Sequence, residues 1–133
     1  MNLSQLTDFF DRQYTPLDGC SLSAREAEIA VREKLPSRPF CLVKHWTILD
    51  LQVSADELEA LRSRGLEPVM VYASSVVLDS RGRYQPGDWV RSSFHTSHGP
   101  PGFFITKNTV YLLLGMGKRQ VITMADLNAL TGQ

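Results

Sequence analysis

The chain has 133 residues, of which 43% are hydrophobic and 21% charged, and its 14 Lys and Arg balance its 14 Asp and Glu. This length suits one domain over residues 1–133, and zero net charge argues against a protein that binds nucleic acid chiefly through its charge. Only Cys20 and Cys41 occur, no secretory leader pattern opens the chain, and no apolar run is long enough to span a membrane, so we expect a cytoplasmic protein with reduced thiols.

Helix signals dominate the first half, residues 1–68. Apolar residues at helical spacing predict an amphipathic helix over residues 3–13. Two Ser-x-x-Glu capping boxes, in which the Ser hydroxyl and the Glu carboxylate each satisfy a free backbone N–H, predict helices over residues 24–35 and 55–64. We expect Ser54 to cap the start of the last of these helices through its capping box, and Gly65 to end it.

Strand signals begin between those two helices and dominate the second half, residues 69–133. A run rich in β-branched and aromatic residues predicts a strand from residue 40 to about residue 49. Further strands are predicted over residues 69–73, 76–78, 89–94, 103–106, 109–114 and 120–123. Residues 95–102 are expected to be a loop, because paired prolines remove the donors that a strand needs, and Thr123 is expected to cap a short last helix.

These elements predict an α+β fold in which N-terminal helices pack on a C-terminal antiparallel sheet, with a short helix at the end. Turns of a few residues between successive strands favour an antiparallel meander. About five short, twisted strands tend to curl into a barrel-like sheet. Such a fold hosts many activities, so function has to come from individual sites.

The chain offers few residues that suggest catalysis or metal binding. Cys41 and His45 share one face of a predicted strand, but they stand roughly 13 Å apart along it, so a buried structural cysteine is the simpler interpretation. His95 and His98 supply only two of the donors that a zinc site needs, so they are interpreted as a weak loop contact. We therefore expect no metal, no cofactor and no catalytic residue.

A glycine-rich segment over residues 115–119 lacks the spacing of a phosphate loop and is interpreted as a hairpin turn with Lys118 and Arg119 at its tip. A second basic turn carries Arg81 and Arg83, and the two turns are predicted to form one binding edge. The residues proposed for this edge are Arg81, Arg83, Tyr84, Arg91, Lys118 and Arg119. Basic residues interleaved with aromatic residues also suit single-stranded nucleic acid, which is the alternative partner.

Two segments carry a resemblance to a known group of proteins. The sequences Gly-Asp-Trp-Val-Arg-Ser-Ser at residues 87–93 and Asn-Thr-Val-Tyr-Leu-Leu-Leu-Gly at residues 108–115 resemble a family of uncharacterised small bacterial and prophage-associated proteins. The similarity covers roughly residues 69–120. It implies no activity, only a role in a bacterium or a mobile element.

The sequence therefore predicts a non-catalytic binding protein. Tyr, Trp and Arg near turns are the residue types that dominate protein interfaces, so another protein is the expected partner, with the chain as a modulator or inhibitor of a host factor. A small nucleic-acid-binding β-barrel is the alternative, and an enzyme that uses Cys41 or the histidines comes third.

Overall fold

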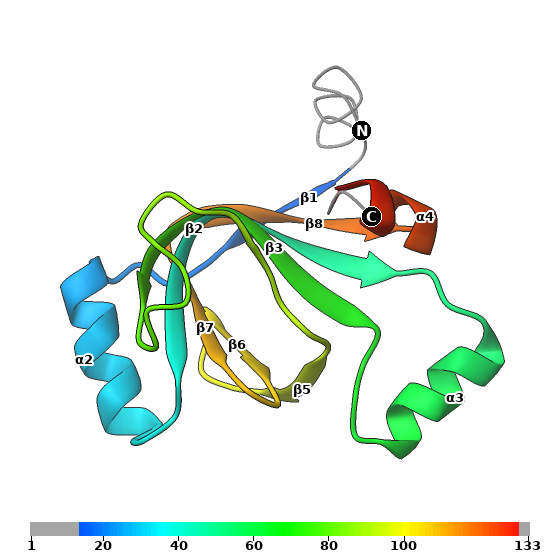
Figure 1. Ribbon diagram of the computed structural model, residues 1–133, viewed down its shortest axis with the longest axis horizontal. Coiled ribbons are helices and arrows are strands. Elements are labelled where there is room, and N and C mark those ends of the chain that lie inside the picture. Colours follow the sequence, from blue (N-terminus) through cyan, green and yellow to red (C-terminus); the bar gives the residue numbers. More distant parts are fainter. Residues whose placement is uncertain (1–13, 131–133) are drawn as a thin grey trace.

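The structure is a computed structural model that describes residues 14–130, so the helix predicted over residues 3–13 lies outside the described residues. Helices and strands of the described part form an α+β fold, as the sequence predicts (Figure 1). In chain order they are β1 (Thr15–Asp18), α2 (Ala24–Lys34), β2 (Phe40–Leu51), α3 (Ala55–Ser63), β3 (Val69–Asp79), β4 (Val90–Arg91), β5 (His95–His98), β6 (Phe103–Thr106), β7 (Val110–Leu113), β8 (Met116–Ile122) and α4 (Met124–Leu130).

Both predicted capping boxes are present. The Ser23 hydroxyl accepts a hydrogen bond from the Glu26 backbone N–H at 3.2 Å, and the Ser54 hydroxyl accepts one from the Glu57 N–H at 3.1 Å. In return each glutamate carboxylate accepts the backbone N–H of its cap residue at 3.0 Å, and this hydrogen bond lowers the pKa of both glutamates. Helices α2 and α3 therefore begin where the sequence predicts.

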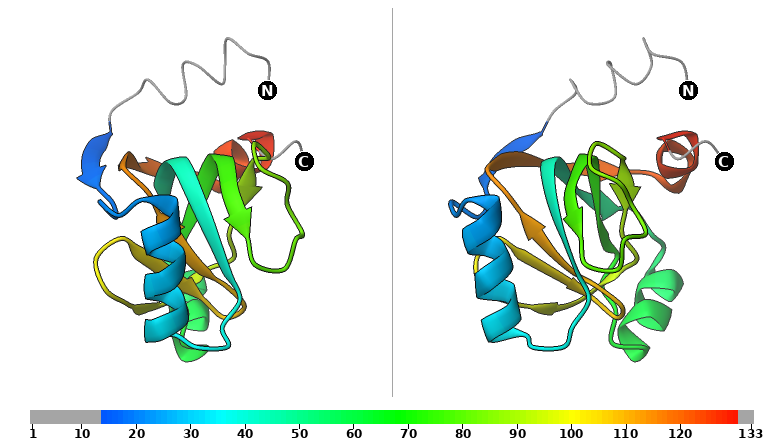
Figure 2. Two further views of the ribbon diagram at one scale, coloured as in Figure 1. Left: turned by 90° about the vertical axis from the view of Figure 1, so that its left-hand side faces the viewer. Right: turned by 60° about the vertical axis from the view of Figure 1, so that its left-hand side comes forward.

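The two helices differ in how they contact the sheet. Helix α2 buries Ala27 and Val31 against Phe40 and Leu42 of β2, and Figure 2 shows it standing alongside that strand. Helix α3 buries none of its residues and stands on the other side of the molecule in Figure 1. Of the described N-terminal helices that were predicted to pack on the sheet, α2 does so and α3 does not. No helix within residues 14–130 is long and apolar enough to cross a membrane.

The sheet is mixed and open, whereas the sequence predicted an antiparallel, barrel-like one. Within the described residues it has eight strands rather than about five, in the order β1-β8-β2-β7-β6-β5, with β3 on β2 and β4 on β3. Strand β2 pairs antiparallel with β3, but it pairs parallel with β7 along Phe40–Val43 and with β8 along Thr47–Leu51. The prediction was wrong because β7 and β8 follow one another along β2 and do not form a hairpin.

The predicted turn over residues 115–119 is instead a bend followed by strand β8. The bend lies at Gly115, whose φ is +72°. The carbonyl of the preceding residue, Leu114, accepts a hydrogen bond from the Trp46 indole N–H at 3.1 Å. A Cβ atom on Gly117 would overlap the Trp46 ring, so this glycine provides room for a core tryptophan.

Other predicted strand boundaries were also wrong. Strand β5 occupies His95–His98, inside the predicted loop, because its backbone pairs with β6 before the prolines are reached. The strand predicted over residues 89–94 is shorter and forms β4. At Ser92 the side-chain hydroxyl accepts the Val71 N–H in place of a backbone carbonyl, so the regular backbone pairing ends there, although the Ser92 N–H still donates to the Val71 carbonyl.

Candidate binding site

An open pocket lies on the face of the sheet where β1, β8, β2 and β3 run side by side. It encloses about 540 Å³, within the range of small-molecule and side-chain pockets. We call it the sheet pocket. Its lining residues are Tyr14, Pro16, His45, Trp46, Thr47, Tyr72, Ser74, Met116, Gly117 and Lys118.

Strand register explains why these side chains meet. Lys118 lies opposite Pro16 on one side and Thr47 on the other, and Thr47 lies opposite Tyr72. Residues opposite one another in neighbouring strands point to the same face, so this row crosses four strands on one surface. Met116 and Ser74 stand two residues from the row on their own strands, and their side chains face the same way.

Helix α4 covers the neighbouring part of the same face. Its Leu127 is buried with Leu49 and Ile122, and Tyr72 packs against this cluster while also lining the sheet pocket. In Figure 1, α4 lies along the upper edge of the sheet at the end of β8. Among residues 14–130, no helix lines the sheet pocket.

The sheet pocket is aromatic and unusually exposed for apolar side chains. Tyr14 is 47% exposed and Met116 is 64% exposed, whereas Trp46 belongs to the core and offers the pocket almost no surface. Trp89 is 51% exposed and stacks on the Tyr72 ring with centroids 5.9 Å apart, which extends the apolar surface beyond the pocket. Burial raises the pKa of Tyr72, so its phenol stays neutral at physiological pH.

The charge of the lining is positive. Lys118 lies over the Tyr14 ring, with its ammonium nitrogen 4.7 Å from the ring centroid, and none of the lining residues between positions 14 and 130 is acidic. Arg119, the next residue, is engaged elsewhere, because its guanidinium donates two hydrogen bonds to Asp50 at 2.6 and 2.7 Å. Of the two basic residues predicted at a hairpin tip, Lys118 alone lines the sheet pocket.

The other residues of the predicted binding edge do not gather at this pocket. Arg83 donates two side-chain hydrogen bonds to buried Asp79 at 3.1 Å, and its guanidinium lies over the Tyr84 ring, which packs on the core. Burial would raise the pKa of Asp79, but the hydrogen bonds and charge of Arg83 hold it below the usual range. Arg81 is exposed, and Arg91 donates to the Met70 sulfur at 3.3 Å.

The residues that the sequence suggested for catalysis or metal binding lie in different parts of the fold. Cys41 is fully buried, and burial, followed by the nearby Asp79 charge, raises the pKa of its thiol to about 12, so it is not a thiolate near neutral pH. His45 lies at the sheet pocket instead. His95 contacts the Phe104 ring at 4.9 Å, and His98 ends β5. No group of three or more metal-ligating side chains occurs in the described part of the chain.

Comparison with known proteins gives a family and no activity. A family model described as a domain of unknown function (DUF6957) matches residues 18–129. No curated protein and no solved structure matches the chain.

Proposed function

The chain belongs to the DUF6957 family of domains of unknown function, and we propose that it is a non-catalytic protein-interaction module whose sheet pocket holds an aromatic side chain of a partner protein. The observation that carries this proposal is the sheet pocket itself, an open aromatic surface on the face of a sheet. Exposed apolar surface concentrated in one place is a feature of binding sites.

The partner's chemistry follows from the lining. Tyr, Trp and Met are residue types enriched in protein interfaces, and aromatic rings pack against one another in stacked or edge-to-face geometries. Lys118, a cation that lines the sheet pocket, favours a partner segment with an acidic residue beside its aromatic anchor. Burying an aromatic side chain gains roughly 4–6 kcal/mol, most of which is offset by the entropy lost on association, so we expect a reversible complex.

The cellular setting is part of the same proposal. Both cysteines are free and buried, as expected of a protein in a reducing compartment, which supports action in the cytoplasm. The bacterial or prophage origin implied by the sequence resemblance suits a modulator or inhibitor of a host protein. Nucleic acid is the alternative partner. Binding to nucleic acid is usually driven by positive charge on the protein, and this chain has zero net charge and places Lys118 as the basic side chain among the described pocket residues.

Selection from a displayed peptide library tests the proposal. We expect peptides enriched in Trp, Phe or Tyr next to Asp or Glu to bind the full chain. Ser74→Trp fills the sheet pocket from an exposed strand position and should abolish this binding. Val121→Trp introduces the same side chain at an exposed position of β8 outside the lining, and it should leave binding intact.

Two results would contradict the proposal. One is that selection yields no consensus, or a consensus that binds Ser74→Trp as well as the parent chain. The other is that single-stranded oligonucleotides bind, with a steep salt dependence, and lose binding in Ser74→Trp while peptides do not bind at all; this result would favour the nucleic-acid alternative.

A further inference from the structure

A second pocket lies between the end of α2 and the turn after β3, away from the sheet pocket. It encloses about 390 Å³, and we call it the arginine pocket. Its lining residues are Arg32, Leu35, Ser37, Arg38, Pro39, Phe40, Ser80 and Arg81, three of them arginines and none of them acidic. We propose that the arginine pocket binds a phosphate group.

The chain fixes the two sides of this pocket to one another. The Phe40 backbone N–H donates to the Ser80 hydroxyl at 2.8 Å, and the Ser80 N–H donates to the Phe40 carbonyl at 2.9 Å. These two hydrogen bonds join the turn that carries Arg81 to the start of β2, next to Arg38. The backbone segments that carry Arg38 and Arg81 are therefore held together by short links, which reduces the ordering that a ligand must impose.

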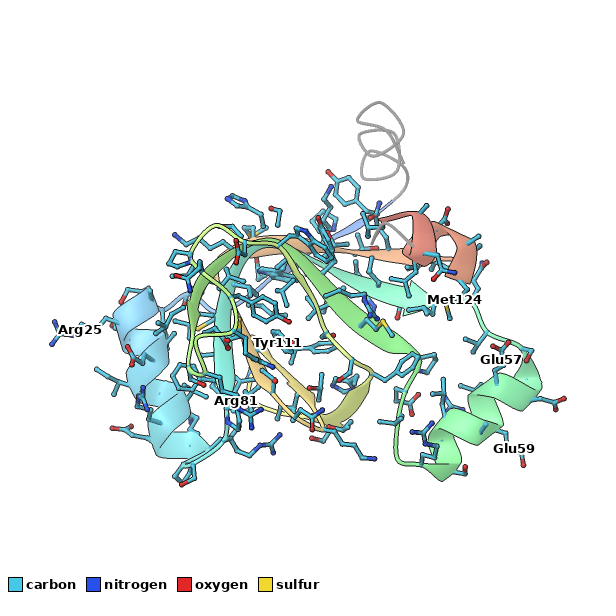
Figure 3. The ribbon with its side chains drawn as sticks, in the orientation of Figure 1. Arg25, Glu57, Glu59, Arg81, Tyr111 and Met124 are labelled. Atoms are coloured by element: carbon cyan, nitrogen blue, oxygen red, sulfur yellow. The ribbon has the colours of Figure 1, made fainter. Side chains whose placement is uncertain are left out.

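Each arginine has a different engagement with the protein. Arg38 donates one hydrogen bond to the Thr106 carbonyl at 3.0 Å. Arg32 lies over the Phe40 ring at 4.9 Å and pairs with Glu28 at 3.0 Å. Arg81 has no hydrogen bond or ion pair among the described residues, and Figure 3 labels it at the base of the molecule near α2.

The carboxylates of Asp79 and Glu28 do not neutralise Arg38 or Arg81. Asp79 stands two residues before Arg81, but its carboxylate is buried and hydrogen bonded to Arg83. Glu28 neutralises Arg32 alone, so Arg38 and Arg81 retain donors for a ligand. Guanidinium groups present fixed pairs of N–H donors that match the oxygens of a carboxylate or a phosphate. A phosphate carries more negative charge and three acceptor oxygens, so a pocket with several arginines suits phosphate better.

Titration of the full chain with inorganic phosphate, followed by NMR, tests the proposal at low ionic strength. We expect saturable shifts of the Ser80 and Arg81 amides, with affinity reduced about tenfold in Arg81→Gln and in Arg38→Gln. Arg81→Gln removes no contact within the described protein, so it keeps the test valid if Arg38→Gln lowers stability. Arg64→Gln, at an exposed arginine after α3, is the matched control and should bind like the parent chain.

A gain of affinity gives an independent check. Glu28→Gln releases Arg32 from its ion pair and should tighten phosphate binding about threefold, the effect of removing one exposed competing carboxylate. Glu59→Gln makes the same change of net charge on α3, which Figure 3 places on the other side of the molecule, and it should have no such effect. Equal gains in both variants would indicate a general charge effect and overturn the proposal.

The source of the phosphate is decided by a second ligand. Glycerol phosphate that binds more tightly than inorganic phosphate would identify an ester as the ligand, and equal affinity would identify free phosphate. Shifts that do not saturate, or that persist unchanged in Arg81→Gln, would overturn the arginine pocket as a phosphate site.

Discussion

Replacing Arg83 with Gln is expected to destabilise the fold, although Arg83 looks like a surface residue in the sequence. Its guanidinium donates hydrogen bonds to Asp79 through Nε and Nη2, both at 3.1 Å. The Asp79 side chain has no exposed surface, whereas the Arg83 side chain is 34% exposed. Losing Arg83 would leave a buried carboxylate with backbone donors only.

The magnitude follows from this burial. Removing one partner of a buried ion pair costs about 3–5 kcal/mol, and partial exposure of Arg83 reduces this to about 2–3 kcal/mol. For a chain of this size, the loss corresponds to a fall in melting temperature of about 8–12 °C at pH 7. Arg81→Gln, two residues away with no partner in the described part of the chain, is the control and should shift the melting temperature by less than about 2 °C.

The stability difference between the parent chain and Arg83→Gln should depend on pH, and the direction follows from Asp79. The pKa of Asp79 is lowered in the folded protein, so its stabilising contribution is complete above its unfolded pKa of about 4 and is lost as the pH falls through the folded value. Thermal unfolding of the parent chain and Arg83→Gln should therefore differ at pH 7 and converge below pH 4. Equal effects of Arg83→Gln and Arg81→Gln at pH 7 would refute the structural role of this pair.

Two further substitutions and one labelling experiment test other parts of the structure. Ser54→Ala should lower the free energy of locally opening α3 by about 1 kcal/mol. Because α3 buries no residue, this loss should appear as faster hydrogen exchange within α3, and the free energy of global unfolding should barely change. Gly117→Ala should lower the free energy of unfolding by at least about 2 kcal/mol, because its Cβ overlaps Trp46; an unchanged urea midpoint would contradict the packing described. Cys41 should resist alkylation at pH 8 in the native protein and react after unfolding, since burial raises its pKa to about 12; rapid native labelling would be inconsistent with that burial.

Local signals in the sequence predicted the helices well. The capping boxes at Ser23 and Ser54 place the starts of α2 and α3, because a cap depends on residues only three positions apart. Thr123 likewise precedes α4, and its hydroxyl accepts the Asp126 N–H at 3.1 Å. Parallel pairing of β2 with β7 and β8 was missed, because it joins segments some 70 residues apart and leaves no local mark.

The candidate sites were predicted only in part. Lys118 and Arg81 were expected to bind a partner, but they lie at different pockets, since the segment after Gly115 is a strand and no hairpin forms there. The aromatic side chains of Tyr14 and Tyr72 were missed as site residues, although Tyr72 and Ser74 alternate with buried Val71 and Ala73. That alternation marks one face of β3 as partly exposed, and it is the signal that would have found the sheet pocket.

The most direct test of the sheet pocket as a site for an aromatic side chain uses two matched ligands, N-acetyltryptophan and N-acetyltryptophanamide. They differ only in that the first carries a carboxylate where the second carries a neutral carboxamide. Each is titrated into the full chain and followed by NMR. We expect saturable shifts at Tyr72, Ser74, Met116 and Lys118 and tighter binding of the ligand with the carboxylate. Both ligands should lose binding in Ser74→Trp and keep it in Val121→Trp. Shifts that do not saturate, lie elsewhere on the molecule, or are the same in Ser74→Trp would contradict the claim that the sheet pocket receives an aromatic side chain with an acidic neighbour.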